Sequence, residues 1–591
     1  MIPTPRQEVE ALVAQSVKSL FGDRAVPGPY VRPCPDARHG DFQTNAAMVQ
    51  AKTEKANPRD LAQKIVDACG ENDIVSRAEI AGPGFVNFRL KPAYAGRNIL
   101  ARLGDERLGC GVVDEAKKKT IVVDYSGPNV AKELHVGHLR STILGDALSR
   151  IFRFQGQTVI TDNHIGDWGT QFGMVLWAYK NEHLRATYPP ELLDTNPLEY
   201  LESIYVYANA EAKLNPEIRE AAKAELLKLQ SLDPENKQLW ERFVGASTAA
   251  MRQLYIRMGI TFDHENGESF YNEMLAPIVK ELIDKGIAQP SEGAVCIFFE
   301  DNEYLKDKPF VIQKTDGAFL YSTTDLATLK YRTTEWKADS IVYVTDGRQQ
   351  THFQQLFAAA RKWGIDAETV KLEHVWFGSI LGPNRKALST RGGGTFKLRD
   401  LLEEAETRAL AIIKEKRNDL TEEEGATLAR ILGIGAVKYA DMAQNRNLDY
   451  IFDWDKLLAF DGNTAPYLIN AYVRTQALFR KAGIEPTQEA YATALPSGLV
   501  LEQPAELTLA KKLMDFEDSV NLVSEEGRPH YLCVYLFDLA TTFHHFYENC
   551  PILVPTNSEE VKMSRLALTS LTARTLKLGL SLLGIETVDR M

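Results

Sequence analysis

Hydrophobic and polar residues alternate with two different periods in the first 112 residues. In residues 57–69, apolar side chains recur at helical spacing, and Asn57 and Pro58 suit the N-cap and first helical position. In residues 85–90, which follow a Gly-Pro-Gly turn, apolar and polar side chains alternate as in a half-buried strand. These patterns predict an N-terminal α+β domain over residues 1–112, closed by a basic, glycine-punctuated linker.

A strand–helix–strand pattern follows the linker. Residues 120–126 (TIVVDYS) are a β-branched strand pattern, residues 135–156 carry apolar side chains at helical spacing, and residues 157–163 (QTVITDN) predict a second strand. Two strands joined by a helix within about forty residues indicate a parallel, doubly wound sheet of the Rossmann type. Ligands of such sheets bind at the carboxyl ends of the strands.

The remaining chain contains an insertion, further strands and a long helical part. Residues 180–260 are polar, rich in Glu and Lys, and helical in pattern. Strand patterns return at residues 293–300, 340–346 and 371–379, and beyond about residue 400 the strong patterns are helical. The predicted fold class is therefore α/β, with these parts after the N-terminal domain: an α/β domain over 113–400 with a helical insertion at about 180–260, a helical connector over 401–455, and an all-α bundle over 456–591.

Composition narrows the class of protein. Of the 591 residues, 44% are hydrophobic and 25% charged, which is ordinary for a globular chain with a sizeable core. No apolar run approaches the roughly 18 residues of a membrane span, and the N-terminus lacks a signal-peptide pattern, so we expect a cytoplasmic protein that does not bind membranes. The six cysteines form no C-x-x-C pair, which predicts reduced and mostly buried thiols. The net charge of −12 argues against a protein whose entire surface binds nucleic acid.

The first candidate site is the histidine pair of HVGH, His135 and His138. As metal ligands they would need a third partner, which only the nearby DNHIGD segment could supply. As core residues they would have to lie within the apolar stripe of the helix, but they precede it. The remaining interpretation is an anion site at a helix N-terminus, where free backbone N–H groups and two imidazoles face phosphoryl oxygens and Gly137 leaves room for a flat base. The usual glycine-rich phosphate loops do not occur in the sequence.

Longer segments carry a family resemblance. HVGH resembles the HIGH signature of class I aminoacyl-tRNA synthetases. The surrounding VVDYSGPNVAKELHVGHLRSTILGDALSR and NHIGDWGTQFGM resemble arginyl-tRNA synthetases, as do VKYADMAQNRNLDYIFDWDKLLAFDGNTAPYL and GDFQTNAAMVQAK. The resemblance covers nearly the whole chain and is least clear in the insertion.

The resemblance implies a reaction and its partners. L-Arginine would be activated with ATP, which carries Mg²⁺, to arginyl-adenylate and pyrophosphate, and then be transferred to the 3' end of tRNA(Arg). His135, Gly137 and His138 would bind ATP and stabilise the transferring phosphoryl group, with no protein nucleophile and no tightly bound metal. The N-terminal domain would bind the tRNA elbow, residues 113–400 would be catalytic, and residues 456–591 would bind the anticodon. A monomer is expected.

A selective arginine site needs several acceptors, because the guanidinium group carries five donors in a fixed fork. The arginine contacts of the resembled family map onto five residues of this chain: Asp124, Asn129, Tyr321, Asp325 and Gln349. Tyr321 and Asp325 are four residues apart and would share one face of a helix start.

The second class I signature, KMSK, has two candidate positions. We reject Lys562-Met563-Ser564-Arg565, because it lies in an amphipathic helical pattern with no glycine loop, and we expect Lys562 and Arg565 on a solvated face. The family position is the glycine-bracketed segment with Lys386 and Ser389, where serine replaces the last lysine. As the compensating cation we favour Lys132, a catalytic candidate three residues before His135, over Arg391.

Candidate tRNA contacts lie at both ends of the chain. Tyr467, Asn470 and Arg474 would share one helical face beside a core stripe of Leu468, Tyr472, Thr475 and Phe479, and an aromatic side chain among polar and basic groups suits unstacked bases. The resemblance adds these further tRNA-binding residues: Tyr547 and Met591 in the bundle, and Phe42, Gln43 and Asn45 in the N-terminal domain.

Three other functions compete with this interpretation. A non-catalytic tRNA-binding relative would be expected to lack the histidines or the arginine acceptors, which are all present. A small-molecule nucleotidylyltransferase would leave the helical C-terminal half unexplained. A metal-dependent hydrolase that uses His135 and His138 would need the missing third ligand.

Overall fold

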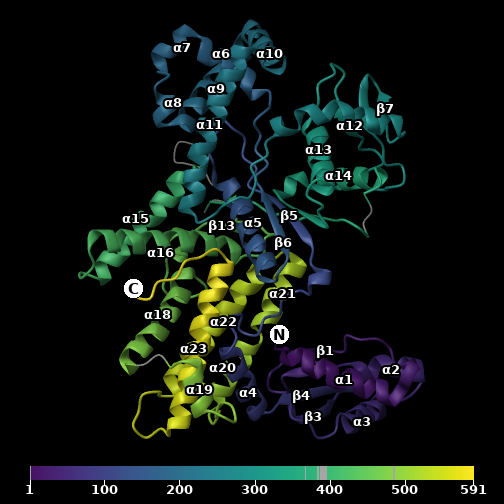
Figure 1. Ribbon diagram of the computed structural model, residues 1–591, viewed down its shortest axis with the longest axis vertical. Helices are drawn as coiled ribbons and strands as arrows, with labels where there is room; N and C mark the ends of the chain where they lie inside the picture. The colour runs from purple at the N-terminus through teal and green to yellow at the C-terminus, as the bar shows by residue number, and fades with distance from the viewer. Residues whose placement is uncertain (1, 366–367, 383–384, 387–395, 484–485) are drawn as a thin grey trace.

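The computed structural model describes residues 2–365, 368–382, 385–386, 396–483 and 486–591 (Figure 1). The purple N-terminal domain lies at the lower right of Figure 1, the central sheet in the middle, the insertion helices at the top and the helical bundle at the lower left. The predicted fold class is confirmed: a parallel sheet with helices, an N-terminal α+β domain and a C-terminal helical bundle.

The N-terminal domain packs helices against a four-stranded sheet. Its elements are α1 (Pro5–Phe21), β1 (Val31–Pro33), β2 (Phe42–Thr44), α2 (Ala46–Glu54), α3 (Pro58–Cys69), β3 (Val75–Ala81), β4 (Phe85–Leu90) and α4 (Pro92–Leu103). The strands are antiparallel in the order β1-β2-β4-β3. The predicted helix start is confirmed, because the Asn57 side chain accepts a hydrogen bond from the Arg59 N–H.

The central sheet is parallel, as the strand–helix–strand pattern predicts. Its strands are β5 (Thr120–Tyr125), β6 (Thr158–Asp162), β10 (Ser340–Val344) and β11 (Lys371–His374), in the order β11-β10-β5-β6. Helix α5 (Val136–Phe154) connects β5 to β6. A Cβ atom added at Gly145 would lie 2.1 Å from the Cγ atom of Tyr125, so the glycine lets α5 pack directly on β5. The first turn of α5 is thereby held at the carboxyl edge of the sheet.

Two additional parts flank this sheet. The insertion is helical: α6 (Gln171–Lys180), α7 (Glu182–Thr187), α8 (Leu192–Thr195), α9 (Pro197–Leu214), α10 (Pro216–Gln230) and α11 (Pro234–Arg257). The second part contains α12 (Asn272–Asp284), β7 (Ala288–Ser291), β8 (Ala294–Ile297), β9 (Phe310–Gln313), α13 (Tyr321–Thr334) and α14 (Gln350–Lys362). The strand predicted at residues 293–300 forms, but it belongs to the separate antiparallel sheet β7-β8-β9.

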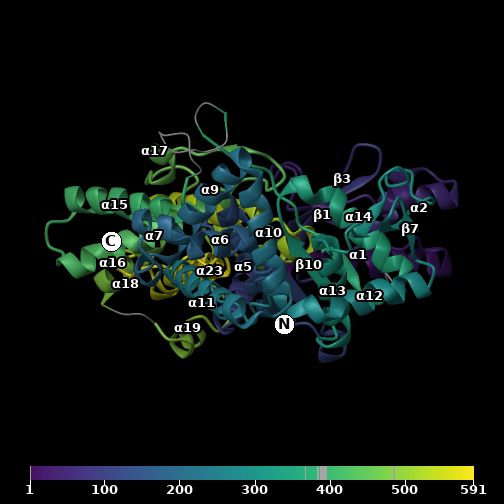
Figure 2. The same cartoon turned by 90° about the horizontal axis from the view of Figure 1, so that it is seen from above.

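The C-terminal part is helical. Its elements are α15 (Leu398–Lys416), α16 (Glu422–Met442), α17 (Trp454–Leu457), α18 (Ala465–Ala482), α19 (Gln488–Ala494), α20 (Pro504–Met514), α21 (Phe516–Glu526), α22 (His530–Asn549) and α23 (Glu559–Leu582), with short strands β12 (Ile380–Leu381) and β13 (Tyr450–Ile451) paired beside them. The core stripe predicted on α18 is buried. In Figure 2, α15 and α16 lie at the left end and α2 and β3 at the right, with α5 between them.

A buried ion pair ties the central sheet to this helical part. Arg140 of α5 donates from Nε to Oδ1 of Asp441 of α16 over 2.8 Å, and neither side chain is more than 1% exposed. Arg140 also donates to the Gly378 carbonyl oxygen, which precedes β12. The helix that carries the histidine pair is therefore anchored from two sides.

Smaller predictions can also be compared with the structure. All six cysteines are free and five are buried, as predicted. Lys562–Arg565 lies in α23, but the expected solvated face is wrong for Arg565, which is buried and donates to Glu506 over 2.7 Å. A carboxylate 59 residues earlier in the chain makes this burial possible, and the local pattern contains no sign of it. None of the described helices is long and apolar enough to cross a membrane.

Candidate active site

A cleft of about 420 Å³ opens where the carboxyl ends of β5 and β10 meet the first turn of α5. Seven of the residues predicted for ATP and arginine line it, contributed by four separate stretches of chain: Asp124, Asn129, His135, Gly137, His138, Asp325 and Gln349. The tertiary structure therefore brings the residues predicted to bind ATP and those predicted to bind arginine to one cavity. Tyr321 is not among the lining residues; it is 63% exposed, and its ring centroid lies 4.9 Å from that of His352.

The two histidines are oriented by the backbone at the start of α5. The Gly137 N–H donates to Nδ1 of His135 over 3.0 Å, and the His135 N–H donates to Nδ1 of His138 over 3.1 Å. Because each Nδ1 accepts a hydrogen bond, each neutral ring carries its proton on Nε2. Both Nε2–H groups thus remain as donors for a ligand.

The charge state of the pair follows from its surroundings. Burial, together with the neighbouring His135 and Lys132, lowers the pKa of His138 to about 3. Burial, Arg348 and Lys132 likewise lower the pKa of His135. At neutral pH the pair therefore presents uncharged N–H donors, which bind an anion by hydrogen bonds rather than by net charge.

Gly137 is required by the position of the His135 ring. A Cβ atom at residue 137 would lie 2.8 Å from Cε1 and 2.9 Å from Nδ1 of this ring, closer than side chains tolerate. The glycine between the histidines therefore allows the His135 ring to accept the hydrogen bond from the Gly137 N–H. This role adds to the one expected from the sequence, where the missing side chain leaves room for a flat base.

On the opposite side, carboxylates supply acceptors. Arg332 of α13 is fully buried and contacts Oδ2 of Asp124 over 2.7 Å and Oδ2 of Asp162 over 2.8 Å. Burial raises the pKa of Asp124, and the Arg332 guanidinium opposes that rise. One oxygen of Asp124 is thus occupied within the protein. Sequence reasoning missed Arg332, although it lies seven residues after Asp325, on the same face of α13.

Asp325 has a partner that the sequence analysis also missed. Its Oδ2 lies 2.6 Å from Nε2 of His352 in α14, and both side chains are mostly buried. His352 follows Gln349 by three residues, and this spacing is the signal that could have identified it. The contact with His352 fixes the orientation of the Asp325 carboxylate, and the other carboxylate oxygen, Oδ1, remains available to a ligand.

The predicted lysines lie outside the lining of the cleft. The ammonium group of Lys132 lies 5.4 Å from the ring centroid of Tyr205 in the insertion, yet its charge still acts on both histidines. The exposed Lys386 follows β12, and its carbonyl oxygen accepts a hydrogen bond from the Gly382 N–H over 2.7 Å. Ser389 and Arg391 lie outside the described residues.

The predicted tRNA contacts of the bundle lie on α18 and α22. The hydroxyl of the half-buried Tyr467 lies 3.0 Å from Nδ1 of His544, Arg474 is exposed, and Tyr547 is 40% exposed. Met591 packs partly buried against the core. Arg474 and Tyr547 are therefore open to a ligand, and Tyr467 contacts His544 of α22, on which the charge of Arg474 also acts.

The predicted tRNA contacts of the N-terminal domain differ in how far their side chains are exposed. Phe42 is 6% exposed, because its side chain belongs to the hydrophobic core, and its tRNA contact stays a prediction. The half-buried Gln43 donates to Asn87 over 2.9 Å, and the half-buried Asn45 precedes α2.

The arrangement does not favour a hydrolytic metal site. Within the described part of the chain, no group of three or more His, Cys, Asp and Glu side chains is placed to hold a metal ion. The DNHIGD side chains have protein partners: Asp162 contacts Arg332, His164 lies 2.9 Å from the Asn266 carbonyl oxygen, and Asp167 accepts from Ser269.

Comparison with known proteins defines first the class and then the family. The model described as "tRNA synthetases class I (R), catalytic domain" matches residues 101–454, which include the central sheet and the cleft. The fold and the cleft are therefore those of a class I aminoacyl-tRNA synthetase. The arginyl tRNA synthetase N terminal domain model matches residues 7–90, and the DALR anticodon binding domain model matches residues 468–591. The chain belongs to the arginine–tRNA ligase family.

Individual relatives agree with this assignment. The chain is 45% identical to the arginine–tRNA ligases of Escherichia coli K12 and Shigella sonnei, over 99% of its own length and 100% of theirs. Among solved structures it resembles the arginyl-tRNA synthetase of Plasmodium falciparum, with 28% identity, a TM-score of 0.84 and complete coverage of both chains. The Thermus thermophilus arginyl-tRNA synthetase follows at 25% identity and a TM-score of 0.80, over 99% of this chain and 100% of that one.

Proposed function

We propose that this chain activates L-arginine with ATP and transfers it to the 3' end of tRNA(Arg). An oxygen of the arginine carboxylate attacks the α-phosphorus of ATP, the bond to the β-phosphate oxygen breaks, and pyrophosphate leaves. A hydroxyl of the terminal adenosine of the tRNA then attacks the arginyl carbonyl carbon and AMP leaves. The observation that carries this proposal is the single cleft that joins the His135–His138 donors to the Asp124 and Asp325 acceptors.

The two sides of the cleft would have separate tasks. The Nε2–H groups of His135 and His138 donate to the phosphoryl oxygens, where negative charge increases in the transition state. Mg²⁺ would arrive with ATP and neutralise phosphate charge. No protein nucleophile is needed, because the carboxylate of the substrate attacks, so the protein contributes position and charge stabilisation.

The arginine side of the cleft would select the guanidinium group. Asp124, Asp325, Asn129 and Gln349 provide acceptor oxygens from three different stretches of chain. Hydrogen bonds to charged groups contribute about 1.5–3 kcal/mol each. Lysine would leave several of these acceptors unpaired, so discrimination can be large without a separate editing reaction. The Arg332 guanidinium would partly neutralise the negative charge of Asp124 and Asp162 before arginine binds.

Pyrophosphate exchange tests the proposed reaction. Labelled pyrophosphate is expected to enter ATP when arginine and tRNA(Arg) are present, with tRNA required because the second signature segment lacks its last lysine. Lysine in place of arginine should give only background exchange. Binding of tRNA(Arg) without any exchange would instead favour the non-catalytic tRNA-binding relative.

Lys132→Ala is expected to lower the rate of this exchange by about tenfold or more, since a cation near the reacting phosphates stabilises charge in a water-poor site. The matched control is Tyr205→Leu, which removes the aromatic neighbour of the ammonium group and keeps the charge. Equal losses in both variants would mean that Lys132 acts by packing against the insertion.

Gly137→Ala is expected to lower kcat for arginine activation by about 10- to 100-fold, because the new methyl group moves the His135 ring and small displacements at a reacting centre are costly. Gly425→Ala is the control, since a Cβ atom there meets its nearest neighbour only at 3.5 Å. Circular dichroism should show both variants folded. Full activity of Gly137→Ala would contradict the proposal that catalysis depends on the orientation of the His135 ring.

The proposed tRNA surfaces and domain division accompany this function. Tyr467, Arg474 and Tyr547 would contact the anticodon, with Met591 adjacent, and Gln43 and Asn45 would contact the elbow. Domains are proposed at residues 1–112, 113–400, 401–455 and 456–591. We also propose a cytoplasmic monomer, whose mass in solution can be measured by light scattering.

A further inference from the structure

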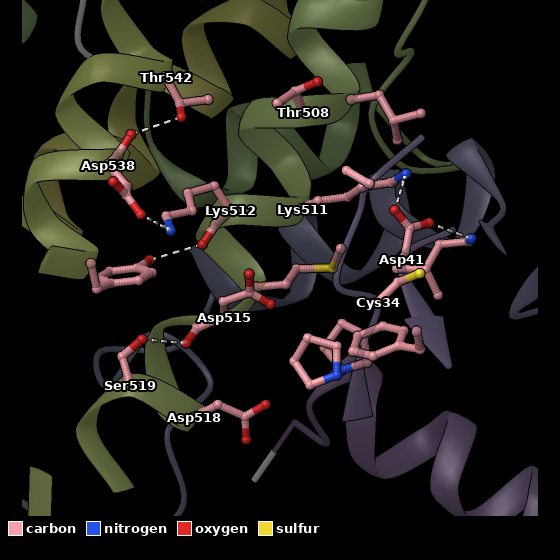
Figure 3. A pocket seen from close by; sticks show the side chains of 18 of the residues that line it. Cys34, Asp41, Thr508, Lys511, Lys512, Asp515, Asp518, Ser519, Asp538 and Thr542 are labelled. Carbon is pink, nitrogen blue, oxygen red and sulfur yellow. Dashed lines mark hydrogen bonds and ion pairs between the residues drawn. The ribbon is translucent and has the colours of Figure 1, made fainter. Parts of the chain in front are cut away.

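A second cavity, of about 880 Å³, lies between the N-terminal domain and the C-terminal bundle (Figure 3). The segment that includes Cys34 and Asp41 forms one wall, and α20, α21 and α22 form the other. It shares no lining residue with the active-site cleft. Its size is within the range of cavities that bind small molecules.

Most charged groups in this cavity are already paired inside the protein. Lys511 donates to Asp41 over 2.7 Å, Lys512 donates to Asp538 over 3.0 Å, and Arg6 donates to Asp518 over 2.9 Å. Figure 3 shows the first two pairs on opposite sides of the cavity. These carboxylates therefore need no ligand to balance their charge.

Asp515 is the exception. No hydrogen bond or ion pair among the described residues reaches its carboxylate, although its carbonyl oxygen accepts from the Ser519 hydroxyl. In Figure 3 it lies between Lys512 and Asp518 on the helical wall. Asp515 is half-buried, and a carboxylate without a protein partner that faces a cavity can accept hydrogen bonds from a ligand; such groups in cavities frequently mark binding sites.

The surroundings of Asp515 bring the pKa of its carboxyl group close to neutral pH. Burial, together with Asp518 and Asp41, raises its pKa to about 7 against the opposing effects of Lys512 and Arg102 of α4. Tyr535 of α22 faces the same region with a pKa raised well above its usual value, so it is neutral. A bound cation would restore the ionised form.

We propose that this cavity binds a small organic cation, a protonated primary amine on an aliphatic stem, whose ammonium group pairs with Asp515. The stem would contact the apolar part of the lining, which includes Leu507, Met514 and Val534. An anionic ligand is disfavoured because the lining holds four aspartates, and both of its lysines, Lys511 and Lys512, are already paired with two of them. The third lining cation, Arg89, donates to the Arg38 carbonyl oxygen. The site is independent of the proposed aminoacylation.

Calorimetric titration of the full chain with pentylammonium chloride tests this site. At pH 8 we expect saturable binding of one pentylammonium ion per chain, and at least tenfold weaker binding of 1-pentanol, which has the same stem without the charge. Asp515→Asn should weaken binding of the ammonium at least tenfold. Asp538→Asn, which alters an ion-paired carboxylate of the same cavity, should change it less than about twofold.

The pH dependence provides a second, independent readout. The ionised fraction of a group with a pKa of about 7 rises about tenfold between pH 6 and pH 8, so the affinity should rise about tenfold over this interval. Asp515→Asn should show no such rise. The proposal is overturned if the wild-type chain shows no saturable binding, if pentanol binds equally well, or if Asp515→Asn binds with unchanged affinity and pH dependence.

Discussion

His138→Asn is expected to lower kcat for arginine activation about 10²- to 10³-fold, the loss that follows removal of one transition-state hydrogen-bond donor. The asparagine oxygen can take the place of Nδ1 and still accept the His135 N–H, so the start of α5 is preserved. What the variant lacks is the Nε2–H group, and the KM for arginine should change little, because this group faces phosphate.

His138→Gln is the matched variant. The longer glutamine side chain can place an N–H donor near the position of Nε2, and it loses the Nδ1 acceptor instead. We expect it to retain more activity than His138→Asn, measured by pyrophosphate exchange at saturating ATP and arginine. The reverse order would show that His138 serves to cap the helix rather than to stabilise the reaction.

Removing one partner of the Arg140–Asp441 ion pair is expected to cost about 3–5 kcal/mol of unfolding free energy, because a buried charge is left uncompensated. Arg140→Met would also release the Gly378 carbonyl oxygen, at the strand that leads to Lys386. The variant should therefore lose activity as well as stability. Urea unfolding followed by fluorescence measures the first effect, and pyrophosphate exchange the second.

Two controls separate burial from charge. The double variant Arg140→Met/Asp441→Leu should recover part of the lost stability, because an apolar pair needs no compensation. Arg430→Met, which breaks the more exposed ion pair with Glu586, should cost about 1 kcal/mol or less. If Arg140→Met cost no more than Arg430→Met, the anchoring role of the buried pair would be refuted.

Local pattern was sufficient for the scaffold around the active site. The period change from strand to helix between β5 and α5, and the position of His135 and His138 before the apolar stripe, are both readable within about twenty residues. Asp325 could be predicted for the same site through the family resemblance. The spacing of His352 after Gln349 marks it as a candidate, but its pairing with Asp325 could not be predicted, because the contact joins α13 to α14 across 27 residues of chain.

Errors occurred where a long-range partner determines burial. Arg565 has a helical surface spacing in sequence but pairs with Glu506 inside the bundle. The strand at residues 293–300 was recognisable, yet its pairing in a separate sheet depends on β7 and β9.

The sequence by itself therefore determined the parallel sheet, the helix that begins at the histidine pair, the helical insertion and bundle, and the family. These depend on hydrophobic period and on short motifs, which are properties of neighbouring residues. Only the tertiary structure decided which charges meet: Arg332 with Asp124, Arg140 with Asp441, and, within the described part of the chain, no side-chain partner for the Asp515 carboxylate. Electrostatic energies depend on distance and burial, and both are defined only when distant segments pack together.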